Sequence, residues 1–451
     1  MTGTVDFGVG SHGITTTDGA LFKQDVTVAE NGSVTFGGGN VIVDKDKNLK
    51  LDSNANFHVA DTLTVGGDLT VENASSLSAG TILATGTVLL HDTSSLSTKD
   101  LQVHTALVLE SDQRGNPDDS KYTYKVNTQK LGSDSGYEGY DVTIRNLDAV
   151  YDANATMTGV KTTTLDNASL ELPYANTAKL GREVVMVGDG GNLLTFKADD
   201  ANPGFVLDGR LVVREEGLST DPSLNLGTRN VVEFKGQGRP EDTVTFTYNA
   251  FAGDNYKGWI RMTGTTVDLA DALNSDPGLS LSIGRGGKIV YDESDARNVH
   301  RLGWTSEGDS NLSAGVLDLS GVDFSQLDED KAVLKVQELV VSGPGTILLN
   351  KSAVQNIGTS GAAQGDDIFD AISGGNRRLV IQTSTGHDQE YYGSIGVKVE
   401  GADEKPLTGF FDANGKFTGD TLAAALGTWG YTAEFSDIGL GLEVTASRLI
   451  P

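Results

Sequence analysis

Cysteine is absent from this chain of 451 residues, which excludes both a disulfide framework and a thiolate metal site. No apolar run reaches the roughly 18 residues that a membrane-spanning helix needs, so we expect no membrane insertion. Lysine and arginine number 34 against 62 aspartates and glutamates, a formal net charge of −28. This excess argues against nucleic acid as a partner, because phosphate backbones are bound by cationic surfaces.

Proline and aromatic residues are also scarce, at 9 residues and 7% of the chain, whereas glycine is abundant at 57 residues. A narrow protein core accommodates Val, Leu, Ile, Ala and Thr more easily than aromatic rings, and glycine serves tight turns. The composition therefore favours short strands joined by turns.

One short phrase recurs along the chain: an apolar residue, five small or polar residues, and a second apolar residue. The copies are V-AENGS-V from Val28, L-DSNAN-F from Leu51, V-ENASS-L from Val71, L-HDTSS-L from Leu90 and Y-DANAT-M from Tyr151. The first four begin 23, 20 and 19 residues apart, and the fifth begins 61 residues later. An imperfect period near 20 residues is typical of a stacked repeat.

The flanks of these copies alternate apolar and polar residues, as in TLTV (62–65) and DLTV (68–71). That alternation predicts strands with one buried face, and the Asn, Asp and Ser between them predict turns. A single coil of this kind cannot bury its apolar face, but stacked coils bury a continuous column. We therefore predict an all-β fold, a parallel β-solenoid over residues 1–360.

Two polar segments, 111–140 and 291–311, interrupt the repeat, and we expect both to project from the stack as loops. After residue 360 the pattern changes, with short helical candidates at 366–372 and 421–426 between strands. We expect residues 361–451 to form a small C-terminal cap module, because an open stack end is an unpaired sheet edge that needs covering.

Three features of the chain resemble the passenger domain of type V secretion autotransporters of Gram-negative bacteria. They are the V-ENASS-L and L-HDTSS-L coils, the stretch NYKGWIRMTGTTVDL (255–269), and the ending GTWGYTAEFSDIGLGLEVTASRLI (427–450). The third feature is similar to the aromatic, Gly- and Leu-rich coils that precede the membrane barrel in that family and assist folding. These features are spread over nearly the whole chain.

The resemblance implies a right-handed three-sided parallel β-helix, exported through the periplasm and outer membrane to the bacterial cell surface. It also implies an adhesin, acting in cell–cell aggregation and biofilm formation, or attaching to host matrix molecules or glycans. The partner would be a second copy on a neighbouring cell or a host molecule. Two alternatives stay open: a polysaccharide-acting β-helix enzyme, and a structural stalk without its own ligand.

We find no motif that predicts catalysis or a cofactor. Gly308, Asp309 and Ser310 match part of a serine-protease nucleophile loop, but Asn311 stands where that loop has glycine. We expect a turn there and no enzyme activity.

Metal motifs are equally incomplete. Asp44, Asp46 and Asn48 begin like a calcium loop, but Leu49 and Ala55 occupy the positions that require Gly and Glu. The six histidines lack ligand spacing, although the coil register could align His58 with His91 on one face. We therefore expect no bound metal.

The remaining candidate is a row of small polar residues in the repeated turns, which stacking would align along the solenoid. Their simplest role is turn formation, and their functional role would be a polar interaction surface for a second molecule. The candidate residues are Asn31, Asp52, Asn54, Asn73, Ser75, Asp92 and Ser94.

Overall fold

The structure is a computed structural model in which nearly all regular elements are strands and most strands pair in parallel. It describes residues 4–14, 19–92, 94–112, 122–131, 139–174, 179–188, 190–207, 211–218, 230–246, 251, 256, 258–268, 280–291, 297–321, 334–341, 343–349, 380–381, 395–399, 405–406, 431–438 and 441–448. Within these ranges no helix is long and apolar enough to cross a membrane. The chain forms two compact units, residues 1–195 with 210–230, and residues 196–209 with 231–451.

The first unit contains a long parallel sheet, sheet A, whose strands follow one another in chain order. Its strands are β1 (Thr4–Phe7), β4 (Asp25–Val28), β7 (Leu49–Leu51), β9 (Leu69–Val71), β11 (Thr87–His91), β14 (Ala106–Glu110), β17 (Tyr140–Arg145), β20 (Val160–Asp166), β22 (Glu183–Val187) and β25 (Val212–Glu216).

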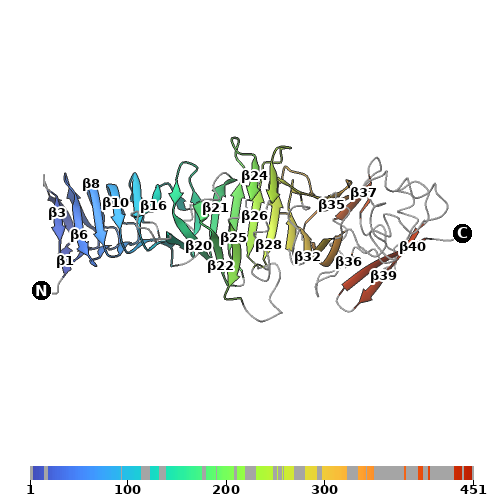
Figure 1. The fold of residues 1–451 in the computed structure, drawn as a ribbon, viewed down its shortest axis with the longest axis horizontal. Helices are drawn as coiled ribbons and strands as arrows, with labels where there is room; N and C mark the ends of the chain where they lie inside the picture. Colours follow the sequence, from blue (N-terminus) through green and yellow to red (C-terminus); the bar gives the residue numbers. More distant parts are fainter. Residues whose placement is uncertain are drawn as a thin grey trace. The chain divides into compact units, whose positions relative to one another are not determined.

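A second parallel sheet, sheet B, alternates with sheet A along the chain. Its strands are β2 (Gly10–Ile14), β3 (Ala20–Phe22), β5 (Gly32–Phe36), β6 (Val41–Lys45), β8 (Asn56–Gly66), β10 (Ser76–Ala84), β12 (Ser95–Ser97), β13 (Asp100–Val103), β16 (Thr128–Lys130) and β19 (Met157–Thr158). Three more strands of this unit, β15 (Tyr122–Tyr124), β18 (Asp148–Tyr151) and β21 (Ser169–Pro173), pair in parallel in this order. Figure 1 shows β6, β8 and β10 side by side.

Strand pairing in sheet A follows the period of the sequence. Leu51 pairs with Val28 on one side and Val71 on the other, and Val71 pairs with Leu90. These partners are 23, 20 and 19 residues apart, and all four side chains are buried. Each strand therefore contacts the equivalent strand of the next coil, which is consistent with the predicted β-solenoid.

The second apolar residue of each of the first four copies lies in sheet B. Phe57 pairs with Val34 and Leu77, and Leu77 pairs with Leu96, all of them buried. The five residues between are the turn from sheet A to sheet B. The recurring phrase thus marks one corner of each coil, as the sequence predicted.

The fifth copy, from Tyr151, does not continue this register. Tyr151 lies in β18 and pairs with Tyr124 of β15, outside sheet A, and Met157 pairs with Thr128 in sheet B. The sequence analysis counted this stretch as a fifth copy of the phrase, but its turn does not join sheet A to sheet B. The phrase specifies a turn between two buried positions, and the chain uses that turn at a second corner as well.

Aromatic side chains form a column inside the first unit despite their scarcity. The rings of Phe36 and Phe57 have centroids 5.6 Å apart, and those of Phe22 and Phe36 are 6.0 Å apart. Ring pairs at this spacing contribute beyond their buried area.

The second unit contains two runs of parallel strands, with paired residues 21 or 22 positions apart at Ile260–Leu281, Leu281–Leu302 and Val267–Ile289. One run contains β26 (Val231–Lys235), β28 (Trp259–Thr263), β30 (Ser280–Ile283), β32 (Arg297–Trp304) and β34 (Leu334–Val341). The other contains β24 (Gly204–Leu207), β27 (Thr243–Phe246), β29 (Thr266–Asp268), β31 (Lys288–Val290), β33 (Gly315–Leu319), β35 (Gly345–Leu349) and β37 (Ile395–Val399), and β38 (Lys405–Pro406) pairs with β37 in the antiparallel sense. The chain passes from one unit to the other within β23 (Leu193–Lys197).

The two predicted loops are not loops throughout. Segment 111–140 contains β15 and β16, and segment 291–311 contains all of β32, each paired in parallel with neighbouring coils.

The predicted cap module over 361–451 stays a prediction, because most of it, including 366–372 and 421–426, lies outside the described residues. The strands described there include β36 (Val380–Ile381), β39 (Tyr431–Ile438) and β40 (Gly441–Arg448). They form an antiparallel sheet in the order β36-β40-β39, unlike the parallel sheets before it.

Candidate interaction surface

The seven predicted surface residues all lie in the repeated turns that lead from sheet A to sheet B. In each turn a small buried residue donates its backbone N–H to the carbonyl three residues earlier, as from Ala55 to Asp52 (3.0 Å) and from Ser75 to Glu72 (2.9 Å). Backbone geometry therefore explains why these residue types occur in the turns. Turn formation was the simpler of the two roles that we predicted for them.

Ser75 and Ser94 do not belong to a surface, since only 1% and 2% of them is exposed. The Ser75 hydroxyl accepts a hydrogen bond from the backbone N–H of Ala55 (3.0 Å) and donates one to the carbonyl of Asp52 (2.6 Å). It joins two neighbouring coils from inside. The prediction that these serines face a partner was wrong, because a small hydroxyl fits the interior of the turn.

Asn31 and Asn54 are exposed, and both adopt the left-handed backbone conformation, with φ of 59° and 58°. Asparagine tolerates this conformation better than most residues. The turn therefore explains both asparagines, and their role in binding stays a prediction.

Asp52, Asn73 and Asp92 are half-buried and take part in a charged row at the edge of sheet A. Lys50 Nζ lies 3.0 Å from Asp52 Oδ1 and 3.8 Å from Glu72 Oε1. The hydrogen bond from Lys50 to Asp52 raises the pKa of the lysine above its usual value. These polar groups are already engaged with neighbouring coils, so they are poor candidates for an uncommitted surface.

A different row of side chains faces outward from sheet B, and the sequence analysis did not single it out. The pairing of β5, β8, β10 and β12 aligns two rows at alternate strand positions. We call these eight residues the hydroxyl face: Ser33, Asn56, Ser76 and Ser95 in one row, and Thr35, His58, Ser78 and Ser97 in the other. Five of the eight are exposed and three are half-buried.

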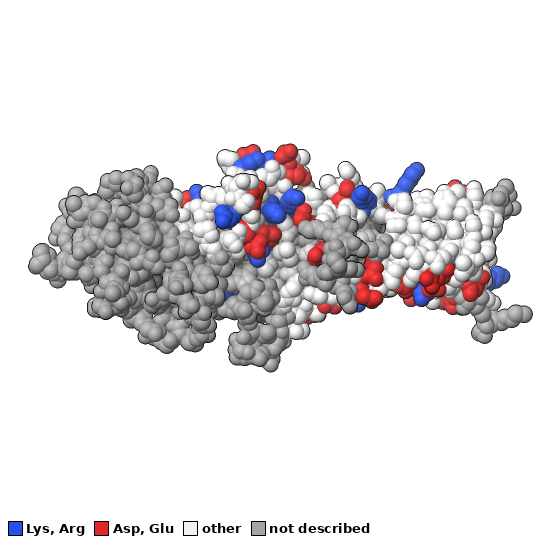
Figure 2. All heavy atoms as spheres, turned by 180° about the vertical axis from the view of Figure 1, so that it is seen from behind, with Lys and Arg blue, Asp and Glu red and all other residues white. Residues whose placement is uncertain are grey.

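The hydroxyl face contains no Asp, Glu, Lys or Arg. Figure 2 shows that charged side chains of the N-terminal unit gather along one border of the visible surface and leave a broad area uncharged. Within the face, His58 Nδ1 lies 2.7 Å from Ser78 Oγ, so neighbouring coils also bond to each other along the row.

A signal for the hydroxyl face was present in the sequence. In N-F-H-V (56–59), S-L-S-A (76–79) and S-L-S (95–97), small polar residues alternate with the buried apolar ones. Alternation of this kind places the polar residues on the outer side of the strand. The sequence analysis used this alternation for the core and chose turn residues for the surface.

An open groove of about 490 Å³ follows the turns that lead from sheet B back to sheet A. It is lined by Lys45, Asp46, Asn48, Gly66, Gly67, Asp68, Thr85, Gly86 and His104. Asn48 Oδ1 accepts a hydrogen bond from the backbone N–H of Asp68, and Asp68 Oδ1 accepts one from that of Thr87, both at 2.8 Å. Of the residues that resembled the start of a calcium loop, Asn48 therefore supports the turn of the next coil.

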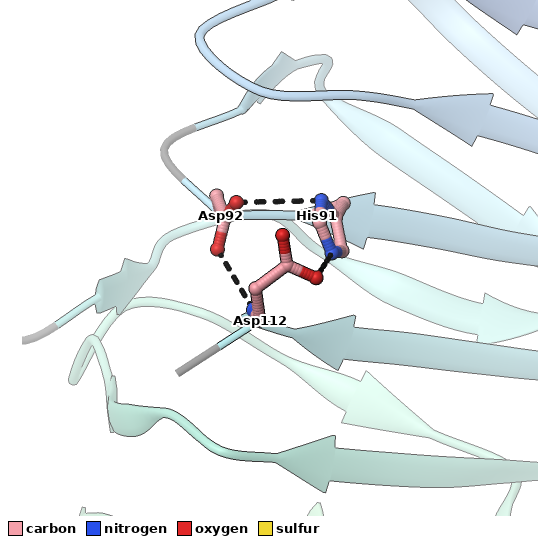
Figure 3. Close-up of side chains that lie close together, drawn as sticks. All are labelled: His91, Asp92 and Asp112. Atoms are coloured by element: carbon pink, nitrogen blue, oxygen red, sulfur yellow. Dashed lines mark hydrogen bonds and ion pairs between the residues drawn. The ribbon is translucent and has the colours of Figure 1, made fainter. Parts of the chain in front are cut away.

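The two histidines that the coil register could align lie in different sheets, His58 in β8 of sheet B and His91 at the end of β11 in sheet A. That possible alignment was wrong. His91 instead lies close to Asp92 and Asp112, and one potential ligand atom from each of the three lies within 4.8 Å of the others. Figure 3 shows the three side chains converging beside the ends of two neighbouring sheet A strands.

The segment Gly308-Asp309-Ser310 forms a turn, as predicted. Asp309 Oδ1 accepts hydrogen bonds from the backbone N–H and the side-chain amide of Asn311, both at 2.9 Å, and the Leu312 N–H donates to the Asp309 carbonyl at 3.0 Å. The aspartate is occupied in stabilising the turn.

Comparisons with known proteins give no further guidance, since no family model, no curated protein and no solved structure matches this chain.

Proposed function

We propose that this chain is a bacterial surface adhesin that associates with further copies of itself on neighbouring cells. The observation that carries the proposal is the hydroxyl face, an uncharged surface on a chain with a net charge of −28. Two copies of so acidic a chain repel each other over most of their surface. The hydroxyl face lets two stacks approach without juxtaposing like charges.

The dimensions of the face support weak contacts that act in number. Four strands at about 4.8 Å spacing and four residues at about 3.3 Å each give a patch of roughly 19 by 13 Å, or about 250 Å². A stable complex buries about 800 Å² per partner, so a single contact of this size is transient. Many chains on each of two cells multiply such contacts, and avidity then holds the cells together.

The proposal includes the finer architecture and the location that the resemblance implies. The three-sided form is supported by β8 and β10 of the first unit, because their pairing falls into two runs on either side of a register shift between Ala79 and Thr81. The right-handed twist rests on the resemblance alone. One strand in sheet A and two runs in sheet B make three sides for each coil. Export through the periplasm and outer membrane to the cell surface rests on the resembling motifs alone.

The experiment is aggregation of beads that carry the full chain at high density. We expect wild-type beads to aggregate, and beads that carry Thr35→Glu with Ser97→Glu to stay dispersed. Ala153→Glu with Asn154→Glu is the matched control, because it adds the same charge at an exposed turn away from the hydroxyl face. The control beads should aggregate like wild type.

Equal loss of aggregation in both double variants would mean that total charge, not the face, governs association. Dispersed wild-type beads at every density would refute self-association. Binding of those beads to host matrix proteins or glycans would then favour the host-directed form of adhesion. Cleavage of a polysaccharide, or no binding of any kind, would favour the enzyme or the stalk.

A further inference from the structure

His91 is held between two sets of acceptor atoms at the end of β11. Its Nδ1 lies 2.7 Å from the amide oxygen Oδ1 of Asn73, and its Nε2 lies 3.2 Å from Oδ1 of Asp112. An amide oxygen only accepts hydrogen bonds, so Nδ1 carries the ring proton. The other ring nitrogen, Nε2, faces a carboxylate oxygen, and a cation fits between these two atoms.

Further carboxylates lie close to the ring and make its surroundings strongly negative. Glu72 Oε2 and Asp92 Oδ2 lie 3.4 and 3.5 Å from Nδ1, and only 13% of the His91 side chain is exposed. Asp92 is fixed in place because its other oxygen accepts a hydrogen bond from the backbone N–H of Asp112 (3.2 Å). Three carboxylates therefore surround one imidazole that is largely shielded from water.

We propose that His91, Asp92 and Asp112 bind a divalent transition-metal ion of the zinc type. Zinc binds His nitrogen and Asp oxygen at about 2.0–2.2 Å in tetrahedral geometry, which separates neighbouring ligand atoms by about 3.3 Å. The 3.2 Å distance between His91 Nε2 and Asp112 Oδ1 matches that separation. Calcium is a poorer fit, because it prefers six to eight oxygen ligands and no imidazole.

The surroundings of the ring match a metal ligand in a second respect. A metal-binding histidine almost always donates its other ring N–H to an oxygen acceptor, which fixes the tautomer and the ring orientation. Asn73 Oδ1 fills that role here.

Asp112 is the last described residue before the segment 113–121, and its side chain is 78% exposed. The ion would tie the coil that contains β11 to the one that contains β14 and leave a coordination position open to solvent.

The test is calorimetric titration of the full chain with Zn²⁺ in the presence of excess Ca²⁺, which occupies weak acidic sites. We expect one strong Zn²⁺ site in the wild-type chain and no such site in His91→Gln. Gln keeps a polar side chain at a position where equivalent coils carry Asp52, Glu72 and Glu110. His58→Gln, at an exposed histidine of sheet B, is the matched control and should bind Zn²⁺ like wild type.

Two further variants separate ligands from supporting groups. Asp92→Asn keeps a residue suited to the left-handed backbone (φ 50°) but exchanges a carboxylate oxygen for a neutral amide, and should weaken Zn²⁺ binding at least tenfold. Asn73→Ala removes only the acceptor for Nδ1 and should weaken binding by about 10–100-fold. Visible spectra of the Co²⁺-loaded chain should show tetrahedral bands in wild type that are absent from His91→Gln.

Zn²⁺ binding that is unchanged in His91→Gln would overturn the proposal, because the ion would then bind elsewhere. Absence of binding to the wild-type chain at a Zn²⁺ concentration of about 1 mM would overturn the proposal as well.

Discussion

Ala74 offers the sharpest test of how the repeated turn is specified. It is exposed and adopts a left-handed backbone with φ of 55°, at the position where the two preceding copies have Asn31 and Asn54. The left-handed conformation costs a residue with a Cβ about 1–2 kcal/mol. Glycine avoids that cost but loses about 0.5–1 kcal/mol of backbone entropy on folding. Ala74→Gly should therefore raise the free energy of unfolding by about 0.5–1 kcal/mol, and Ala74→Asn should act in the same direction.

The matched control is Ala60→Gly in β8, at an exposed alanine outside the left-handed region. There glycine relieves no strain, so it should lower the free energy of unfolding by about 0.5–1 kcal/mol. Urea denaturation of both variants measures the sign directly, provided that the dependence on urea is unchanged. If Ala74→Gly destabilised the chain as Ala60→Gly does, the turn would not be under the backbone strain that we infer.

Three further predictions concern the core, the stacking of turns and pH. Leu77→Ala should lower the free energy of unfolding by about 2–5 kcal/mol in urea denaturation, because Leu77 is fully buried. Gly86→Ala should reduce the urea midpoint, because a Cβ there would lie 2.3 Å from Asp68 Oδ1 and 2.6 Å from the backbone of Gly67, so neighbouring turns would have to separate. Burial alone would raise the pKa of Asp242, but hydrogen bonds from the Arg239 side chain and from two backbone N–H groups outweigh burial and hold the pKa below its usual value. Its contribution to stability is thus complete above the unfolded-state pKa of about 3.9 and is lost as the pH falls through the lower folded-state pKa, so Asp242→Asn should flatten the decline of the urea midpoint below pH 4.

The corner between sheets A and B could be predicted from the sequence because it depends on local chemistry. Apolar residues at both ends of each phrase, such as Leu51 and Phe57, face the core, and the residues between them form a turn. Period and alternation together specify which residues of neighbouring coils pair. Every element of that prediction follows from residues less than about 25 positions apart.

The buried position of Ser75 depends on contacts with another coil, which the local sequence pattern does not contain. Ser75 and Ser76 are adjacent residues of the same type, yet the first is buried inside the turn and the second lies on the hydroxyl face. The hydrogen bonds of Ser75 to Ala55 and Asp52 in the previous coil hold it inside, whereas alternation with the buried Leu77 places Ser76 on the outer side of its strand. The position of Tyr151 at a second corner could not be predicted for a similar reason. The phrase specifies a turn but not which two sheets that turn joins.

Stacking also restricts where the negative charge of the chain can lie. Equivalent positions on successive coils are about 4.8 Å apart, and two like charges at that distance repel by about 1 kcal/mol even in water. At the edge of sheet A the register places Arg145 between Glu110 and Asp166, and its guanidinium lies 3.1 and 2.9 Å from their carboxylates. A row of outward positions can thus carry charge if cations interrupt it, or it can remain neutral.

Sheet B follows the second course on the hydroxyl face, where neutral Ser, Thr, Asn and His side chains occupy both outward rows of four coils. Neutrality there removes repulsion between neighbouring coils and, by the same geometry, between two copies that meet face to face. A complete row of Glu on this face would destabilise the stack of coils, and it would also oppose the proposed association between copies. Thr35→Glu and Ser97→Glu lie at opposite ends of one row, with His58 and Ser78 between them, so neither Glu has a like-charged neighbour within that row. Their effect should therefore fall mainly on the proposed contact between copies.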